Sequence, residues 1–244
     1  MKKKTLKDCK ILALIPARGG SVGLKNKNLK KLANKPLIFW PINSAKKSKY
    51  IDSVVVSTDS KKIKRKAMKF GAKVPFLRPK RLAKSTSKSF DSILHCLNYF
   101  KKNKTFFDYI VLLEPTSPLT THEDIDRALK ILHTHKSNST SIVGVSKNTN
   151  NHPSFLTKIK KNGNIKPYLK NVEAIRRQSL SPLYFFDGSL YISKVDTILK
   201  KKTFYHDKTL PYITEKYKSF EVDDMIDYVC IEAILKNKKK IING

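Results

Sequence analysis

Residues 11–28 read ILALIPARGGSVGLKNKN, in which an apolar run is followed directly by a loop with three glycines and three basic side chains. A glycine-rich turn after a buried strand brings backbone N–H groups close to a phosphate. The loop differs from the dinucleotide-binding fingerprint, because Ser21 stands where that pattern has its second glycine, and it lacks the G-x-x-x-x-G-K-[ST] pattern. The stretch therefore predicts a strand followed by a phosphate-directed loop of a third kind.

Strand-like and helix-like segments alternate through the first 145 residues. Such alternation is typical of βαβ units, so we expect an α/β fold with a mostly parallel sheet flanked by helices. Thr121 and Asp124 have the spacing of a capping box at a helix start. The pattern predicts strands at 11–16, 53–57, 73–77, 109–113 and 141–145, and helices at 35–47, 60–70, 90–100 and 121–133.

The pattern changes after residue 145, where residues 146–186 are polar and irregular. Residues 158–167 predict a hairpin around Asn162-Gly163. A strand at 189–193 and a helix at 223–235 follow, and the lysine-rich tail is expected to fray. The sequence thus favours a single domain over residues 1–244, with an inserted excursion at about 146–186.

Composition limits the class of protein. The chain has 244 residues, 40% of them hydrophobic, and no run approaches the roughly 18 apolar residues of a membrane span. The apolar run at 11–16 is too short for a secretion signal, so a cytoplasmic location is expected. Cys9, Cys96 and Cys230 are scattered, which favours reduced cysteines without metal-ligand spacing.

The formal net charge of +32 raises the alternative of a basic nucleic-acid-binding protein. Only 7 of the 51 basic residues are arginine, the residue preferred for bidentate phosphate and base contacts, and the lysines are spread over the whole chain. Nucleic acid is therefore disfavoured as the partner. A field this positive still attracts a small polyanionic substrate.

Four polar segments, at 17–28, 57–59, 114–119 and 221–224, are expected to meet at one site, because ligands of open α/β sheets bind beyond the carboxyl ends of the strands. Arg18, Lys25 and Lys27 are suited to a triphosphate. Glu221 and Asp223 point the same way in an extended chain, which suits Mg²⁺, although they are also placed to cap the next helix. Asp59 favours a cap for the helix at 60–70 over a ligand contact.

At this point the sequence resembles a family, the acylneuraminate cytidylyltransferases (CMP-N-acetylneuraminic acid synthetases). The family opening A-R-x-x-S-K-G-x-x-x-K-N stands here as ARGGSVGLKNKN, and the similarity extends over roughly residues 10–236. Four further motifs match in order and spacing: Arg78-Pro79-x-x-Leu82-Ala83, Leu113 to Leu119 (LEPTSPL), Asp187 to Ile192 (DGSLYI) and Phe220 to Asp223 (FEVD).

The resemblance implies a Rossmann-like nucleotidyltransferase fold with a small dimerisation excursion, and hence a homodimer. It implies catalysis by Arg18, Lys27 and Asp223, with Mg²⁺ held by Glu221 and Asp223. The implied nucleotide-binding residues are Ala17, Arg18, Ser21, Lys27, Asn28, Arg78 and Ser89. The implied sugar-binding residues are Glu114, Arg177, Gln178, Asp187, Tyr191, Phe204 and Tyr205.

The chain departs from the family pattern at several of these places. Val22 stands for the lysine of S-K-G, with Lys25 as a possible substitute, and Thr120 stands for the arginine after P-T-S-P-L. Glu221 replaces an aspartate. Glu114 and Asp187 replace neutral amides, which adds negative charge to a pocket that binds an anionic sugar. Either the sugar differs, for instance by an amino group, or nearby lysines compensate.

The implied reaction transfers CMP from CTP to the anomeric hydroxyl of a sialic-acid-like 2-keto-3-deoxy nonulosonic acid, with release of pyrophosphate, to give an activated sugar for surface glycans. Asp223 or a metal-bound water takes the proton. A 3-deoxy-manno-octulosonate cytidylyltransferase is the nearest alternative, disfavoured because its opening carries S-T-R after the arginine where this chain has S-V-G. A different sugar-1-phosphate nucleotidyltransferase is disfavoured by the P-T-S-P turn.

Overall fold

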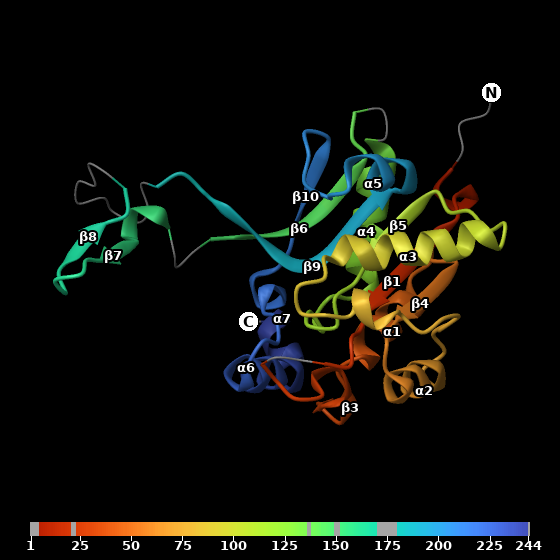
Figure 1. Ribbon diagram of the computed structural model, residues 1–244. Helices are drawn as coiled ribbons and strands as arrows, with labels where there is room; N and C mark the ends of the chain where they lie inside the picture. Colours follow the sequence, from red (N-terminus) through yellow and green to blue (C-terminus); the bar gives the residue numbers. More distant parts are fainter. Residues whose placement is uncertain (1–4, 21–22, 136–137, 149–151, 170–179, 244) are drawn as a thin grey trace.

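The computed structural model describes residues 5–20, 23–135, 138–148, 152–169 and 180–243. Its centre is a six-stranded sheet in the order β10-β6-β9-β5-β1-β4 (Figure 1). All neighbouring pairs are parallel except those of β9, which runs antiparallel to both β5 and β6. The strands are β1 (Ile11–Pro16), β4 (Ser53–Ser57), β5 (Tyr109–Leu112), β6 (Ser141–Lys147), β9 (Tyr184–Lys194) and β10 (Thr209–Ile213). The predicted α/β fold with a mostly parallel sheet is confirmed.

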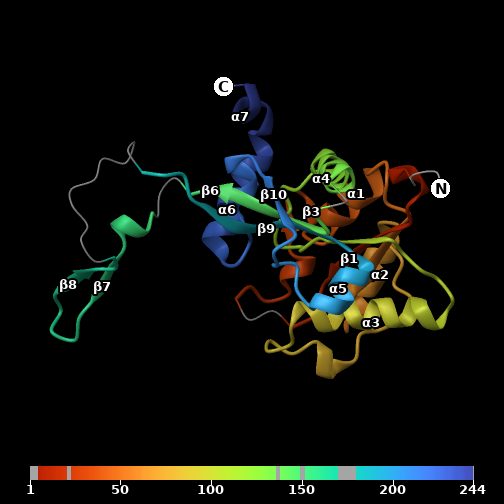
Figure 2. The ribbon, with the colours of Figure 1, turned by 90° about the horizontal axis from the view of Figure 1, so that it is seen from above.

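Helices cover both faces of this sheet, as the view from above shows for α1 and α4 on one side and α3 and α5 on the other (Figure 2). The helices are α1 (Phe39–Lys47), α2 (Lys61–Lys69), α3 (Ser89–Lys102), α4 (His122–Thr134), α5 (Val195–Lys201), α6 (Met225–Lys236) and α7 (Lys238–Asn243). Short 3₁₀ turns lie at Leu6–Asp8, Lys27–Leu29, Lys80–Leu82, Pro153–Phe155 and Lys216–Ser219.

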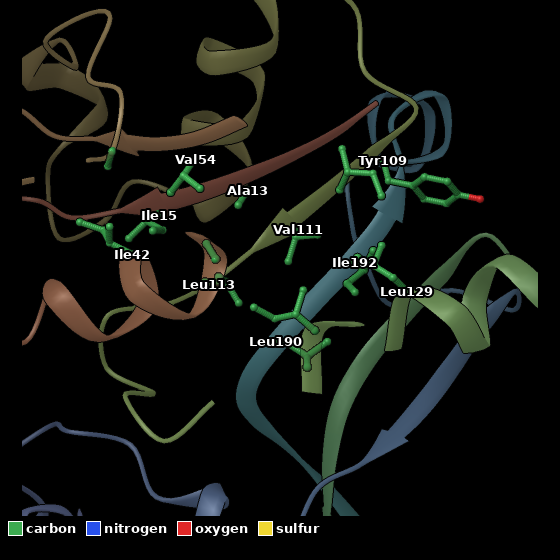
Figure 3. Packing of buried hydrophobic residues seen from close by; sticks show 14 of the residues in the cluster. Ala13, Ile15, Ile42, Val54, Tyr109, Val111, Leu113, Leu129, Leu190 and Ile192 are labelled. Carbon is green, nitrogen blue, oxygen red and sulfur yellow. The ribbon is translucent and has the colours of Figure 1, made fainter. Parts of the chain in front are cut away.

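The core forms on both faces because β1 is apolar throughout and alternate side chains of a strand point to opposite sides. Ile11, Ala13 and Ile15 pack with the helices α1, α2 and α4. Figure 3 shows this cluster continuing across β5 and β9 through Val111 and Ile192. Leu12 and Leu14 face the other way, toward α3 and α5.

Several local predictions are confirmed. The strands at 11–16 and 53–57 have the predicted bounds. The hydroxyl of Thr121 and the carboxylate of Asp124 form the predicted capping box of α4. The predicted hairpin exists as β7 (Thr157–Ile159) and β8 (Ile165–Pro167), with Gly163 at a positive φ of 83° in the turn. This hairpin lies well away from the sheet in both views (Figures 1 and 2).

Other local predictions are wrong. The helix expected over 35–47 begins at Phe39, because β3 (Lys35–Pro36) pairs with β2 (Lys31–Leu32) in a small ribbon. Residues 73–77 form only one bridge, between Lys73 and Val55, since Pro75 has no N–H to continue a ladder. Residues 238–243 are helical rather than frayed. The elements α5 and β10 were not foreseen.

None of the three cysteines, all of them among the described residues, forms a disulfide, and Cys9 and Cys96 are buried. Within the described part of the chain, no helix has the length and apolar character needed to cross a membrane.

A buried carboxylate joins the three strands at the far end of the sheet from β4. Asp187 Oδ2 accepts hydrogen bonds from Ser146 Oγ at 2.7 Å and from the hydroxyl of Thr214, and Oδ1 accepts one from Ser189 N at 3.0 Å. The pairing of β6 with β9 shifts register between Val143 and Val145. Gly144 lies at this shift, where a Cβ would overlap Ser189 Oγ and approach Asp187 Oδ1 to 2.6 Å.

Gly144→Ala should therefore lower the free energy of unfolding by about 1–3 kcal/mol, because the added methyl group overfills a packed junction. Urea unfolding of the purified protein measures this change. Gly20→Ala is the control, since nothing lies within 4 Å of a Cβ added there, and its effect should stay within about 0.5 kcal/mol. Equal stability of the two variants would contradict the packing argument.

Candidate active site

The loop that follows β1 is held by contacts of its own backbone. Ala17 is buried and its N–H donates to the carbonyl of Ser57 on β4 at 2.9 Å. Gly19 N donates to Asp59 Oδ1 at 2.8 Å, and Asn28 Nδ2 donates to the carbonyl of Arg18 at 2.9 Å. Asn28 thus fixes the backbone at Arg18 and is itself buried.

The structure assigns Asp59 a role other than the predicted helix cap. Asp59 does not cap α2, because the N-cap is Ser60, whose Oγ accepts a hydrogen bond from Ile63 N. The Asp59 carboxylate instead accepts a hydrogen bond from Gly19 N and so holds the loop. Ser21 and Val22 lie outside the described residues, and Lys25 is exposed. The loop lies at the carboxyl end of β1, as the sequence predicted.

Arg78 lies buried beneath the loop, with 6% of its surface exposed. Its guanidinium donates to the carbonyl of Ser57 at 2.6 Å and to Ser92 Oγ at 2.8 Å. Its Nε has no hydrogen-bond partner among the described residues. Burial lowers the pKa of Arg78, and the carboxylates of Asp59 and Glu114 oppose this shift.

A hollow lined by basic and hydroxyl side chains opens beside Arg78, and we name it the cationic hollow. Its lining joins the loop after β1 to the start of α3. Its residues are Pro16, Arg18, Arg78, Leu82, Lys84, Ser85, Ser87, Lys88, Ser89, Ser92 and Glu114. Four of these side chains carry positive charge, so the hollow favours an anion. It brings together three of the predicted nucleotide-binding residues, while nothing in the sequence indicated Lys84 or Lys88.

A second hollow, the aromatic hollow, adjoins the first. It is lined by Ser89, Phe90, Ile93, Leu112, Glu114, Tyr191, Ile198, Lys202, Thr203, Phe204 and Tyr205. Its mainly apolar wall with a few polar groups is the usual lining of a small-molecule site. The rings of Tyr191 and Phe204 lie 5.4 Å apart, and burial, followed by the neighbouring hydroxyl of Tyr205, raises the pKa of Tyr191.

The aromatic hollow gathers four of the seven residues predicted to bind sugar: Glu114, Tyr191, Phe204 and Tyr205. Arg177 and Gln178 lie outside the described residues. Asp187 does not line the hollow, because its carboxylate is enclosed by Ser146, Ser189 and Thr214. Lys202 and Thr203 also line the aromatic hollow. The sequence analysis did not predict a role for either residue.

Glu114 is shared by the two hollows, as is Ser89. Burial, and then the charge of Glu221, raise the pKa of Glu114 to about 7, although Arg78 and Lys27 act in the opposite direction. The carboxyl group lies at the wall that the cationic and the aromatic hollows share.

The acidic pair lies where the loop and the end of β5 meet the start of α6. Val222 between the two is fully buried, and its N–H donates to the carbonyl of Thr116 at 2.8 Å. Glu221 Oε1 accepts from Ser117 Oγ at 3.0 Å. Lys27 Nζ contacts the carbonyl of Val222 at 2.8 Å and Asp223 Oδ1 at 3.2 Å.

Two glycines allow the close approach of these segments. A Cβ at Gly23 would lie 2.6 Å from the carbonyl oxygen of Asp223, and one at Gly188 would overlap the carboxylate of Glu221. Gly188 also has a positive φ of 66°. The acidic pair does not cap α6, because Asp224 does so through bonds from Ile226 N and Asp227 N.

The chemistry of the acidic pair suits a divalent cation. Burial raises the pKa of Glu221, and the nearby carboxylates of Asp223 and Asp187 raise it further, so a cation there would relieve their repulsion. The described residues include no cluster of three or more potential metal ligands. Two carboxylates are nevertheless enough for Mg²⁺, which keeps several waters and takes further ligands from substrate phosphates.

Known proteins resemble this chain over most of its length. The sequence profile described as Cytidylyltransferase matches residues 12–241. The chain is 38% identical to a Legionella pneumophila protein named CMP-N,N'-diacetyllegionaminic acid synthase, over 93% of this chain and 97% of that protein. It is 33% identical to an N-acylneuraminate cytidylyltransferase of Streptococcus agalactiae, over 90% of this chain and 52% of that protein.

A solved structure titled CMP:2-keto-3-deoxy-manno-octonic acid synthetase complexed with CTP superposes with a TM-score of 0.68, over 94% of this chain and 99% of that chain. At 14% identity this is a likeness of fold. The sequence profile and the relatives confirm the family that the motifs predicted. The chain belongs to the cytidylyltransferase family.

Proposed function

We propose that the chain transfers the cytidylyl group of CTP to the anomeric hydroxyl of a nine-carbon 2-keto-3-deoxy acid sugar and releases pyrophosphate. The observation that carries this proposal is the pair of adjoining hollows, one cationic and one aromatic, which share Ser89 and Glu114. A charged nucleotide and a sugar bound in the two hollows would meet at this shared wall. The named substrates of the similar proteins, N-acylneuraminate and N,N'-diacetyllegionaminate, support the sugar class.

The nucleotide would occupy the cationic hollow and the loop after β1. Backbone N–H groups of the loop and the side chains of Arg18 and Lys27 would neutralise the triphosphate, and Arg78 and Ser89 would contact the cytidine side. As the α-phosphorus is attacked, negative charge builds up on the departing pyrophosphate. Arg18 and Lys27 would stabilise that charge, and this kind of stabilisation contributes much of the rate in phosphoryl-type transfers.

Glu221 and Asp223 would hold Mg²⁺ against the phosphates. When bound, the ion polarises phosphate oxygens and favours ionisation of a hydroxyl next to it. Neighbouring side chains orient the two carboxylates: Ser117 donates a hydrogen bond to Glu221, and Lys27 forms an ion pair with Asp223. The aromatic hollow would orient the sugar, so that its anomeric hydroxyl faces the α-phosphorus and water is excluded.

We also propose that the protein is a homodimer formed through the β7–β8 hairpin. Ile159 and Ile165 are 79% and 68% exposed, and Phe155 and Tyr168 beside them are also exposed. An isolated two-stranded hairpin is marginally stable in water, and an apolar surface of this kind favours a partner. A second copy would cover these side chains. The reaction would take place in the cytoplasm, where CTP is made.

The first prediction concerns the nucleotide. With a nonulosonic acid and Mg²⁺, pyrophosphate release from CTP should exceed release from ATP, GTP or UTP at least about tenfold, since a site whose hydrogen bonds fit one base rejects the others. A panel of the four nucleotides, each with nonulosonic acids and with 3-deoxy-manno-octulosonate, measures this. Equal release from ATP or GTP would contradict the assignment.

The second prediction concerns the acidic pair. Asp223→Asn should lower kcat at least about 100-fold, because the loss of a ligand charge removes several kcal/mol of stabilisation, and Glu221→Gln should act in the same direction. Asp223 is 79% exposed at its side chain, so the melting temperature should not change. Asp224→Asn is the matched control: asparagine caps a helix about as well as aspartate, so the α6 cap is kept and the dependence on Mg²⁺ should not change. Near-normal turnover of both active-site variants would refute the metal assignment.

The third prediction concerns the hairpin. The protein should scatter light as a dimer of 27.9 kDa chains, and Ile159→Glu with Ile165→Glu should give a monomer, because charges do not bury in an apolar interface. Lys161→Glu changes the charge of the same hairpin without touching the apolar side chains and should leave the dimer intact. A fully active monomer of the unmodified protein at micromolar concentration would rule out this interface.

A further inference from the structure

Helix α6 has two apolar faces, and the rest of the described chain covers one of them. Ile231 is fully buried on the inner face. On the outer face Met225, Ile226 and Val229 are exposed, Ile226 to 74% and Val229 to 59%. Cys230, one turn after Ile226, is also exposed. Residues three and four apart on a helix lie side by side, so these side chains form one continuous apolar patch. We name it the outer face of α6, and a patch of this kind favours a protein partner.

The outer face of α6 and the β7–β8 hairpin carry opposite charges. Residues 223–232 include four acidic side chains and no basic one, whereas residues 156–169 include four lysines and no acidic side chain. Two of the acids form ion pairs within the chain, and the other two, Asp224 and Asp227, accept hydrogen bonds from backbone N–H groups. The first turn of α6 is therefore a negative place in a chain of net charge +32.

This charge distribution decides between the ways in which two copies can meet. Contact of hairpin with hairpin would gather the lysines of both copies, and contact of α6 with α6 would gather the acids of both. Like charges that face each other across an interface disfavour association. Contact of the hairpin with α6 instead joins unlike charges around two apolar surfaces, which matters because two copies of charge +32 repel each other.

The geometry of the chain allows this contact only between two copies. In both views the hairpin lies away from α6 of its own chain, although α6 is on the side of the body toward which the hairpin extends (Figures 1 and 2). In a twofold dimer each contact forms twice, because the surface of one copy that meets the second is met in turn. Both open apolar surfaces of each copy would then be covered.

We propose that the hairpin of one copy docks on the outer face of α6 of a second copy, with Ile159 and Ile165 against Ile226 and Val229. This contact rests on the homodimer proposed above and names the surface that receives the hairpin. The hairpin lysines would lie at the rim, near the acids of α6. Rim charges act mainly on the rate of association, so the apolar side chains decide whether the dimer forms.

The first test is the oligomeric state, measured by light scattering, with far-UV circular dichroism to establish that each variant is folded. Ile226→Glu with Val229→Glu should turn the dimer into a monomer, because charges do not bury in an apolar interface. Met68→Glu is the matched control and should remain a dimer. Met68 is also an exposed apolar side chain on a helix, at 54%, and α2 lies away from α6 in both views. A dimer that persists in the α6 variant would overturn the proposal and favour another seat for the hairpin, such as the exposed residues 183–186.

The second test uses the thiol of Cys230 and does not depend on a disruptive substitution. Cys9 and Cys96 are buried, so a bismaleimide, which joins two accessible thiols, reaches Cys230 alone in the folded protein. Ile165→Cys should give a covalent dimer on a denaturing gel, and adding Cys230→Ser should abolish it. The unmodified protein should remain a single chain on the same gel.

The other outcomes separate the alternatives. A covalent dimer of the unmodified protein would indicate α6 against α6, and one that survives Cys230→Ser would indicate hairpin against hairpin; either contradicts the proposed contact. So does the absence of a covalent dimer from Ile165→Cys when the protein scatters light as a dimer. A monomeric unmodified protein would remove the proposed homodimer and this contact with it. Pyrophosphate release from CTP, measured on the same preparations, tests the proposed reaction independently of the interface.

Discussion

The site depends on the hydroxyl groups of one turn, residues 115–121, which attach the late part of the chain to the early part. Thr120 Oγ1 donates to the carbonyl of Ser189 at 2.8 Å, and Ser117 Oγ lies 3.0 Å from both the carbonyl of Gly188 and Glu221 Oε1. The carbonyl of Thr116 accepts from Val222 N. These bonds hold Gly188 of β9 and the acidic pair beside the segment that follows β5, while Lys27 holds the acidic pair from the loop after β1.

An ion pair with the first turn of α4 also fixes the segment before α6. Lys218 is buried and contacts both oxygens of Asp124 at 2.8 and 2.9 Å, while Tyr212 donates to Asp124 Oδ1. Burial alone would raise the pKa of Asp124, but the bonds from Lys218 outweigh it, and the net shift is downward. The carboxylates Glu114 and Glu221, by contrast, have raised pKa values. Carboxyl groups whose pKa values are perturbed in this way gather at functional sites, and here the raised ones lie beside the acidic pair and the hollows.

The sequence predicted the half of the fold in which local pattern and packing agree. The run at 11–16 is apolar at every position, as a strand buried on both faces requires, and Thr121 with Asp124 marks a helix start by local chemistry alone. The edge strand β10 was missed because Thr209–Ile213 contains Pro211 and has little alternation, and only pairing with β6 makes it a strand. The motifs named seven of the residues that line the two hollows, but Lys84, Lys88 and Lys202 line them through loop geometry. A chain with so many lysines gives no sequence signal that would single out these three.

Glu114 and Asp187 show why a departure from a family pattern has no fixed meaning until its neighbours are known. By the resemblance described above, both stand where the family pattern has an amide. At Asp187 three donors surround the carboxylate, and Gly144 leaves the space that this arrangement needs, so the extra charge becomes part of the sheet. At Glu114 no such side-chain donors are present among the described residues, and the charges that oppose the rise of its pKa are those of Arg78 and Lys27. The same kind of carboxyl group is therefore held by hydrogen bonds inside the sheet at Asp187, and by the charges of neighbouring side chains at Glu114, where the two hollows share a wall.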